Sequence, residues 1–370
     1  MRVPARCLTL LLCLASAVSL AAPAPSVVGE RHGQARSASA AVRDAAQHDG
    51  LRYTVWYPAA PDARERPITI GPPDAPLFTV GSAAVDDAPI APGALPTLLL
   101  SHGNGGSARM MGWFGIAMAR AGYLVIAVDH PGNNGVEPMT LAGSILIWER
   151  AEDLKTALAA VQADPQLGAH VDATRLGVAG FSAGGFTALA AAGARVDMAH
   201  LLAFCRATPD DGVCQPQLEM PASTLQARID AAATPALAPH MAQAGDDHGV
   251  PGVRAAFLMA PAIVQAFTPA QLRALPQPVS ILLGDADAVA PPSTNGEVLA
   301  ALAPQATLRT LPGVGHYEFL AACTPLGRQR LAALCPPEAQ QAAAHAAAIA
   351  QALQVFGDTL AAGTGVAATR

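Results

Sequence analysis

From residue 97 onward, short segments of almost entirely apolar residues alternate with longer segments of helical periodicity. Strands that are apolar on both faces lie in parallel sheets, because the crossover between parallel strands lays helices over both faces. We therefore expect an α/β fold with a mostly parallel central sheet and helices on both faces. The predicted strands are Thr97–Ser101, Tyr123–Asp129, Arg175–Gly180, Arg254–Met259, Val279–Gly284 and Thr307–Leu311. The predicted helices cover residues 107–121, 146–163, 183–192, 293–303 and 338–356.

The alternation stops between residues 194 and 252, a segment that is too long for a simple connection. This segment contains two cysteines, several prolines and a predicted short helix over residues 223–231. We interpret it as an insertion that covers a site, within a single α/β domain at residues 51–370.

Residues 1–22 have the pattern of a secretory signal peptide. Arg2 and Arg6 precede the apolar stretch Leu8–Leu20, and small residues up to Ala22 offer a cleavage site. The stretch is short for crossing a bilayer, although an uncleaved anchor is the alternative. The sequence thus predicts a secreted or periplasmic protein without stable membrane insertion.

The next segments are predicted to be irregular. Residues 23–50 show no stable periodicity, so we expect a flexible leader. Leu51–Tyr57 alternates as an edge strand does. Residues 58–95, rich in Pro, Asp and Gly, predict loops and one or two short strands such as Leu77–Val80.

Removal of the signal peptide leaves four cysteines, Cys205, Cys214, Cys323 and Cys335. An even number of cysteines in an exported chain indicates disulfides, here two. Four cysteines can be paired in three ways, and the sequence does not decide among them. The pairs 205–214 and 323–335 would each close a local loop. Four free thiols are the alternative, which an oxidising compartment disfavours.

Charge and composition restrict the partners. The net charge of −6, without a basic block, argues against nucleic acid and leaves a small molecule as the expected partner. Asp246-Asp247-His248 offers metal ligands, but a solvated loop explains the same residues, and no Cys-x-x-Cys pattern is present. We expect neither a metal nor a cofactor.

Gly180-Phe181-Ser182-Ala183-Gly184 stands between a predicted strand and a predicted helix. A strand that turns sharply into a helix strains its central residue, and small residues two positions away relieve the crowding. Such a turn projects the Ser182 hydroxyl above the sheet. The alternative, an ordinary glycine-rich turn, does not explain this strand and helix context.

A serine nucleophile needs a base and an acid that orients the base. His316 follows the last strand on a glycine-flanked loop, and it comes after the serine and the acids in chain order. Asp287 and Asp285 both follow the strand Val279–Gly284. We favour Asp287 as the acid, with Asp285 as the alternative acid.

An oxyanion also needs hydrogen-bond donors. The backbone N–H of Ala183 is one candidate, because it follows the nucleophile. The backbone N–H of Asn104 is the other, in the glycine-rich loop after the strand Thr97–Ser101. We interpret the neighbouring His102 as a structural residue.

Together these residues resemble the α/β-hydrolase superfamily, from about Leu51 to the C-terminus. Finer details resemble the bacterial predicted dienelactone hydrolases, which are related to platelet-activating-factor acetylhydrolases. The resemblance implies a Ser182, Asp287 and His316 triad with Asn104 at the oxyanion. True dienelactone hydrolases use a cysteine where this chain has Ser182, so the resemblance does not give the substrate. The matching pieces besides the serine turn are Val55-Trp56-Tyr57-Pro58, Ser101-His102-Gly103, Gly122-Tyr123, Val128-Asp129-His130-Pro131-Gly132, and Arg150 with Asp153.

The sequence thus predicts a secreted serine esterase that cleaves small carboxylic esters through an acyl-enzyme. A lipase-like or polyester hydrolase, acting on long-chain or polymeric esters as in lipid degradation, is the alternative. A non-catalytic binding protein on the same fold is the second alternative. Such proteins usually lose a triad member, and this sequence keeps all three.

Overall fold

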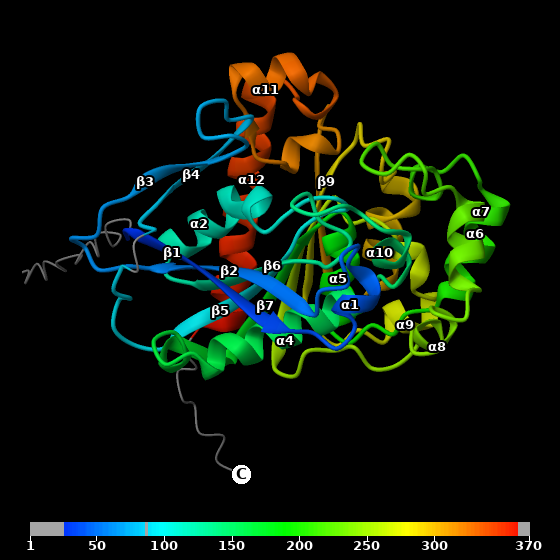
Figure 1. Cartoon of the computed structure of the whole chain (residues 1–370), viewed down its shortest axis with the longest axis horizontal. Coiled ribbons are helices and arrows are strands. Elements are labelled where there is room, and N and C mark those ends of the chain that lie inside the picture. Colours follow the sequence, from blue (N-terminus) through cyan, green and yellow to red (C-terminus); the bar gives the residue numbers. More distant parts are fainter. Residues whose placement is uncertain (1–25, 86–87, 362–370) are drawn as a thin grey trace, which may run out of the picture.

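The computed structural model describes residues 26–85 and 88–361, so the predicted signal peptide lies outside the described residues. A central sheet lies between two layers of helices (Figure 1), which confirms the predicted α/β architecture. The order of the eight strands is β1-β2-β6-β5-β7-β8-β9-β10. Strands β5 to β10 run parallel, whereas β1 and β2 are antiparallel to their neighbours. A small second sheet has the order β11-β4-β3.

The strands of the main sheet are β1 (Val28–Arg36), β2 (Gly50–Pro58), β5 (Leu95–Ser101), β6 (Leu124–Asp129), β7 (Val171–Phe181), β8 (Val253–Met259), β9 (Val279–Gly284) and β10 (Ala306–Leu311). The small sheet comprises β3 (Arg66–Ile70), β4 (Phe78–Ala83) and β11 (Ala322–Cys323). The helices are α1 (Ala40–Arg43), α2 (Gly112–Arg120), α3 (Leu141–Ile145), α4 (Glu149–Ala163), α5 (Ala183–Ala191), α6 (Met198–Ala207), α7 (Leu225–Ala232), α8 (Ala238–Met241), α9 (Pro269–Arg273), α10 (Gly296–Leu302), α11 (Pro325–Arg330) and α12 (Glu338–Leu360).

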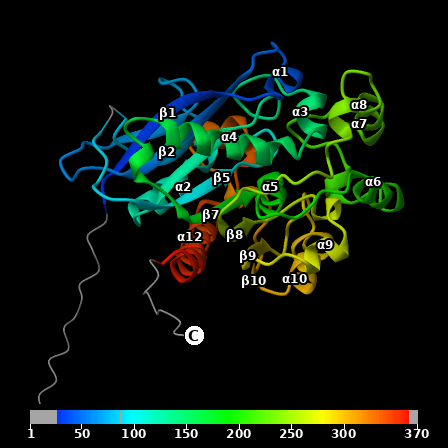
Figure 2. The same cartoon turned by 90° about the horizontal axis from the view of Figure 1, so that it is seen from below.

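The sheet separates two hydrophobic cores. Side chains of β5 alternate between them, so that Leu99 faces the core under α4, α5 and α10, whereas Leu98 and Leu100 face the core under α2 and α12. Figure 2 shows α4 and α12 on opposite sides of β5 and β7. This two-sided burial explains why the central strands are apolar throughout.

The prediction of a flexible leader is wrong for residues 28–43. Strand β1 pairs along its whole length with β2 and takes the edge position that was predicted for Leu51–Tyr57. Helix α1 then buries Arg43, which forms an ion pair with Asp153 on α4 at 2.7 Å. Neither feature produces hydrophobic periodicity, because an edge strand exposes polar side chains and α1 is held by charge rather than by an apolar face.

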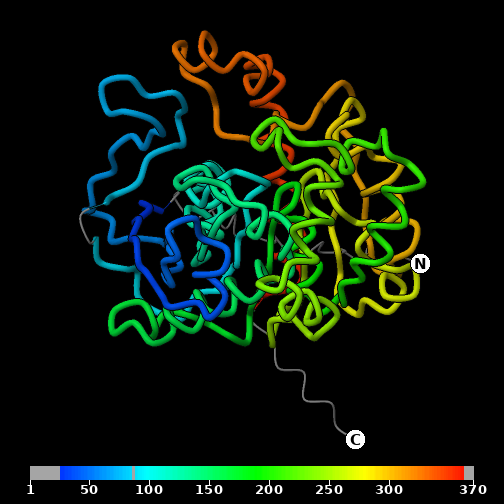
Figure 3. The backbone as a smooth tube through the Cα atoms, turned by 45° about the vertical axis from the view of Figure 1, so that its right-hand side comes forward, coloured from blue at the N-terminus to red at the C-terminus, as the bar shows by residue number. Residues whose placement is uncertain are grey.

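The insertion folds as helices α6, α7 and α8, with a short 3-10 helix at Gly212–Cys214. In Figure 3 its green coils lie beside the yellow segments that follow β8 and β9. Helix α7 also contacts α3, which precedes α4 in the chain. The insertion therefore lies at the carboxyl end of the sheet. Among the helices of the described residues, none combines the length and the apolar character needed to span a membrane.

Candidate active site

Ser182 lies in the turn between β7 and α5. Its backbone has φ 56° and ψ −119°, a conformation that residues with side chains rarely adopt. A Cβ on Gly180 would collide with the backbone of Gly184, and a Cβ on Gly184 would collide with the carbonyl of Ser101. The turn therefore requires glycine on both sides, and it holds the Ser182 hydroxyl above the carboxyl end of the sheet.

Ser182, His316 and Asp287 form a continuous hydrogen-bonded chain. Ser182 Oγ lies 2.8 Å from His316 Nε2, and His316 Nδ1 lies 2.7 Å from Asp287 Oδ2. All three side chains are buried. The tautomer that satisfies both contacts donates from Nδ1 to the carboxylate and accepts the serine hydroxyl at Nε2. Because the three residues follow β7, β9 and β10, the parallel sheet brings them to one edge.

The two aspartates that the sequence leaves open have different surroundings. Asp287 is 5% exposed, and its second carboxylate oxygen accepts the backbone N–H groups of Val289 and Ala290 at 2.9 and 2.8 Å. Asp285 is exposed and accepts the backbone N–H of Gly313 at 2.6 Å. Thus Asp287 contacts the imidazole, whereas Asp285 braces the turn that leads to it.

Asn104 and Ala183 line one cavity together with Ser182. Ala183 is the first residue of α5, where backbone N–H groups lack intrahelical acceptors. Among the described residues, neither the Asn104 nor the Ala183 backbone N–H group has a protein acceptor. They are therefore available to an oxygen that carries developing negative charge beside the serine.

A family model described as the alpha/beta hydrolase family matches residues 98–326, more than half of the chain. The chain belongs to this family. A ferulic acid esterase from Streptomyces cinnamoneus is similar in fold, with a TM-score of 0.59 and 22% identity over 92% of each chain. A puromycin-hydrolyzing peptidase of Mycobacterium tuberculosis gives a TM-score of 0.47 and 15% identity, over 90% of this chain and 40% of that one. No curated protein matches the sequence.

In this alpha/beta hydrolase, Asn133 supports the loop that carries Asn104. Its side-chain Nδ2 donates to Asn104 Oδ1 at 2.9 Å, and its Oδ1 accepts the backbone N–H of Gly105 at 3.3 Å. Behind it, Arg150 Nη1 donates to the same Oδ1 at 3.1 Å. Sequence reasoning missed Asn133, because an asparagine in a loop between a strand and a helix gives no signal of its partners.

A buried polar network continues beneath this loop. Arg150 donates to the carbonyl of His102 and to Ser101 Oγ, and Ser101 Oγ lies 2.9 Å from His130 Nε2. His130 Nδ1 lies 2.9 Å from Asp153. Burial, followed by the charge of Arg150, lowers the pKa of His130 to about 3. The network therefore holds a neutral histidine at neutral pH.

His102 also lies in this network and not beside the serine hydroxyl. Its Nε2 accepts the backbone N–H of His130 at 3.2 Å, and its Nδ1 lies 2.6 Å from the carbonyl of Gly103. Burial, followed by the charge of Arg150, holds its pKa well below the usual value. Both ring nitrogens are therefore occupied by backbone groups, which is a structural role.

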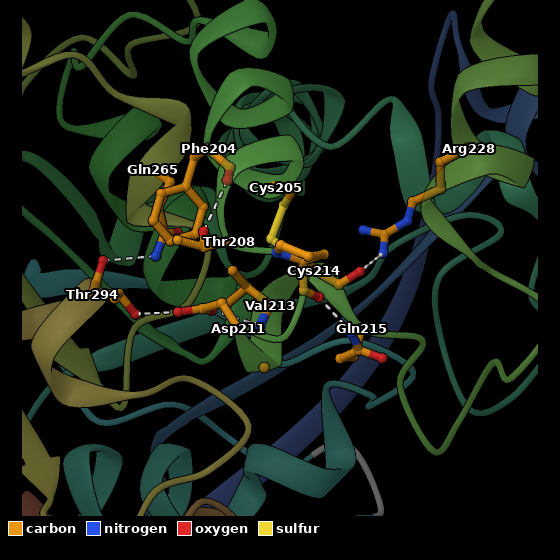
Figure 4. Close-up of a disulfide and its surroundings, with 12 residues drawn as sticks. Phe204, Cys205, Thr208, Asp211, Val213, Cys214, Gln215, Arg228, Gln265 and Thr294 are labelled. Atoms are coloured by element: carbon orange, nitrogen blue, oxygen red, sulfur yellow. Dashed lines mark hydrogen bonds between the residues drawn. A yellow bond between two sulfur atoms is a disulfide. The ribbon is translucent and has the colours of Figure 1, made fainter.

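The four cysteines form the two local pairs, Cys205–Cys214 and Cys323–Cys335. The first pair joins the end of α6 to the 3-10 helix of the insertion (Figure 4). Among residues 26–85 and 88–361, no group of three or more His, Cys, Asp or Glu side chains is arranged to hold a metal. His248 of the Asp246-Asp247-His248 segment contacts Glu152 at 2.8 Å.

Proposed function

We propose that this alpha/beta hydrolase is a serine esterase that cleaves carboxylic esters through an acyl-enzyme. The observation that carries the proposal is the buried Ser182–His316–Asp287 chain. Asn104 and Ala183, whose backbone N–H groups have no acceptor among the described residues, line the same cavity as Ser182. A nucleophile, its base, the group that orients the base and an oxyanion site are the components that acyl transfer needs.

The proposed reaction begins when Ser182 Oγ attacks the acyl carbon while His316 Nε2 accepts its proton. The carbonyl oxygen becomes an oxyanion, which the N–H groups of Asn104 and Ala183 stabilise. Collapse of the intermediate breaks the bond to the alcohol, and His316 returns the proton to it. Water then attacks the acyl-enzyme by the same route and releases the acid. Asp287 holds the imidazole and stabilises its charged form.

Replacement of Ser182 by alanine tests this function. The S182A variant should lose both turnover of a p-nitrophenyl acyl ester and covalent labelling by a fluorophosphonate probe. Circular dichroism of both proteins controls for folding. Undiminished turnover in S182A would reject the serine, and a wild-type protein that neither turns over nor labels would favour a non-catalytic binding protein.

We also propose that the protein is exported. The support is the signal-peptide pattern at residues 1–22 together with two disulfides, which form in oxidising compartments. Mass spectrometry of the protein recovered from a bacterial periplasm should show an N-terminus near residue 22. We further propose that it belongs with the predicted dienelactone hydrolases related to platelet-activating-factor acetylhydrolases, on the motifs quoted above.

A further inference from the structure

An apolar chamber of about 400 Å³ lies within the insertion and beside α3. Its wall comprises Ile145 of α3, Leu201 and Leu202 of α6, and Leu225 and Ile229 of α7, among others. A volume of this size is in the range of small-molecule sites, roughly 300–1,000 Å³. An apolar cavity of about 150 Å³ already holds a benzene ring. The chamber therefore has room for more than one ring or for a substantial aliphatic arm.

The chamber adjoins the cavity that contains Ser182. The two cavities share the wall residues Ser144, Ile147, Val213, Arg228 and Ile263. His316 lines neither of these cavities; it lines a third, smaller cavity that also contains Ser182. Because His316 returns its proton to the leaving alcohol, the alcohol lies on the His316 side. The chamber is therefore on the acyl side of the scissile bond.

Arg228 is the one charged side chain that lines the chamber or the adjoining Ser182 cavity, as far as the described residues go. Its Nη2 donates to the carbonyl of Cys214 at 2.9 Å (Figure 4). Its Nε is buried without an acceptor, and within the described chain Arg228 has no carboxylate partner. An arginine remains protonated, so a partly buried guanidinium without a counter-ion is costly unless a ligand supplies one.

We propose that the acyl part of the substrate is an apolar arm that occupies the chamber and carries a carboxylate, which Arg228 binds. A guanidinium pairs with a carboxylate through charge-assisted and often bidentate hydrogen bonds. The apolar wall stabilises the carbon chain that leads to this group. The inference rests on the proposed esterase function and specifies its substrate class: half-esters of apolar dicarboxylic acids. Arg228 is then a specificity-determining residue and takes no part in the chemical steps.

Paired substrates test the assignment. Mono-p-nitrophenyl esters of dicarboxylic acids, from succinate to sebacate, are compared by kcat/KM with p-nitrophenyl esters of the unsubstituted acids of equal length. Of each pair, the wild-type enzyme should have the higher kcat/KM for the ester that carries the carboxylate, once its acyl chain is long enough to reach Arg228. In Arg228→Gln this preference should fall about 10- to 100-fold, the range expected for losing a hydrogen bond to a charged group.

Two further variants separate charge recognition from structure. Arg206→Gln removes a charge from an exposed position on α6, outside both cavities, and should leave the preference unchanged. Ala232→Phe narrows the chamber, because Ala232 lines its wall. This variant should have a lower kcat/KM for esters of long acyl chains and an unchanged kcat/KM for p-nitrophenyl acetate. An equal loss on both members of each pair in Arg228→Gln would overturn the assignment, because a purely structural role affects both alike.

Failure of this inference differs from failure of the esterase function. A wild-type enzyme that hydrolyses the neutral esters with no preference for the carboxylate would overturn only the role of Arg228. A wild-type enzyme that hydrolyses neither set, and whose Ser182 is not labelled by a fluorophosphonate, would overturn the proposed function itself.

Discussion

Replacement of Asn133 by alanine should impair catalysis without removing a group that touches the substrate. The change deletes the hydrogen bond to Asn104 Oδ1 at 2.9 Å and the acceptor of the Gly105 N–H. It also removes the acceptor of Arg150 Nη1. The loop that aims the Asn104 N–H at the oxyanion then loses its lateral support.

The expected decrease in kcat follows from the Asn104 N–H group, which the N133A variant retains. Loss of a whole oxyanion donor lowers kcat by about 10²–10³. In N133A the Asn104 N–H stays present but is less well aimed, so we expect a decrease in kcat of about 10- to 100-fold. KM should change little, because the oxyanion forms only along the reaction path. The free energy of unfolding should fall by about 1–3 kcal/mol, since Arg150 loses one of its buried acceptors.

The neighbouring Asn134 provides a matched control. Like Asn133, which also donates to Ser144 Oγ at 3.3 Å, Asn134 is buried and makes four side-chain hydrogen bonds. Its partners, however, are His130, Val136 and Glu137 instead of the Asn104 loop. Steady-state kinetics on a p-nitrophenyl ester and urea unfolding should be measured for both variants. N134A should lose stability and keep kcat. Unchanged kcat in N133A, or equal decreases in both variants, would refute the positioning role.

Three other predictions follow from the same structure. Asp287→Asn should lower kcat about 10⁴-fold, whereas Asp285→Asn should stay within about tenfold of wild type, since only Asp287 contacts the imidazole; equal losses would contradict this assignment. Below the ordinary histidine pKa of 6.5, the unfolded chain binds a proton that buried His130, with its pKa of about 3, does not. The free energy of unfolding should therefore decrease as the pH is lowered from 6.5 to about 3, by up to about 1.4 kcal/mol per pH unit for this residue. Urea unfolding that is insensitive to pH in this window would speak against it. Replacing Cys323 and Cys335 together by serine should lower the free energy of unfolding by about 2–4 kcal/mol, seen as a lower melting temperature, and an unaltered melting temperature would count against a stabilising bridge.

The fold could be predicted because it depends on local patterns. Apolar strands, helical periodicity and the glycine-flanked Ser182 all leave signals within about ten residues of sequence. Ser182 and His316 could be proposed from their positions after strands, and the structure brings them within 2.8 Å. The choice between Asp285 and Asp287 depends on how the turn after β9 folds. That turn places Asp287 inward and Asp285 in solvent, which no local pattern encodes.

The features that the sequence did not predict depend on contacts between distant residues. Arg43 and Asp153 are far apart in the chain, and their ion pair follows only once β1 has joined the sheet. Arg228 belongs to a short helix with ordinary composition, so its position in the wall between two cavities appears only in three dimensions.

The buried network gives the N-terminal segment a part in supporting the candidate site. Arg43 holds Asp153, Asp153 contacts His130, and the contacts continue through Ser101 to Arg150 under the Asn104 loop. Apolar residues of the same volume would often be as stable, because burying charge carries a desolvation cost. Hydrogen bonds, however, fix direction as well as distance, and an oxyanion donor must be fixed in direction. Removing one partner of a buried pair costs about 3–5 kcal/mol, so the loss of Arg43 would leave Asp153 as an uncompensated buried charge. The segment from β1 to α1 is therefore part of the same α/β domain, because its Arg43 supplies the cation that pairs with Asp153 beneath that loop.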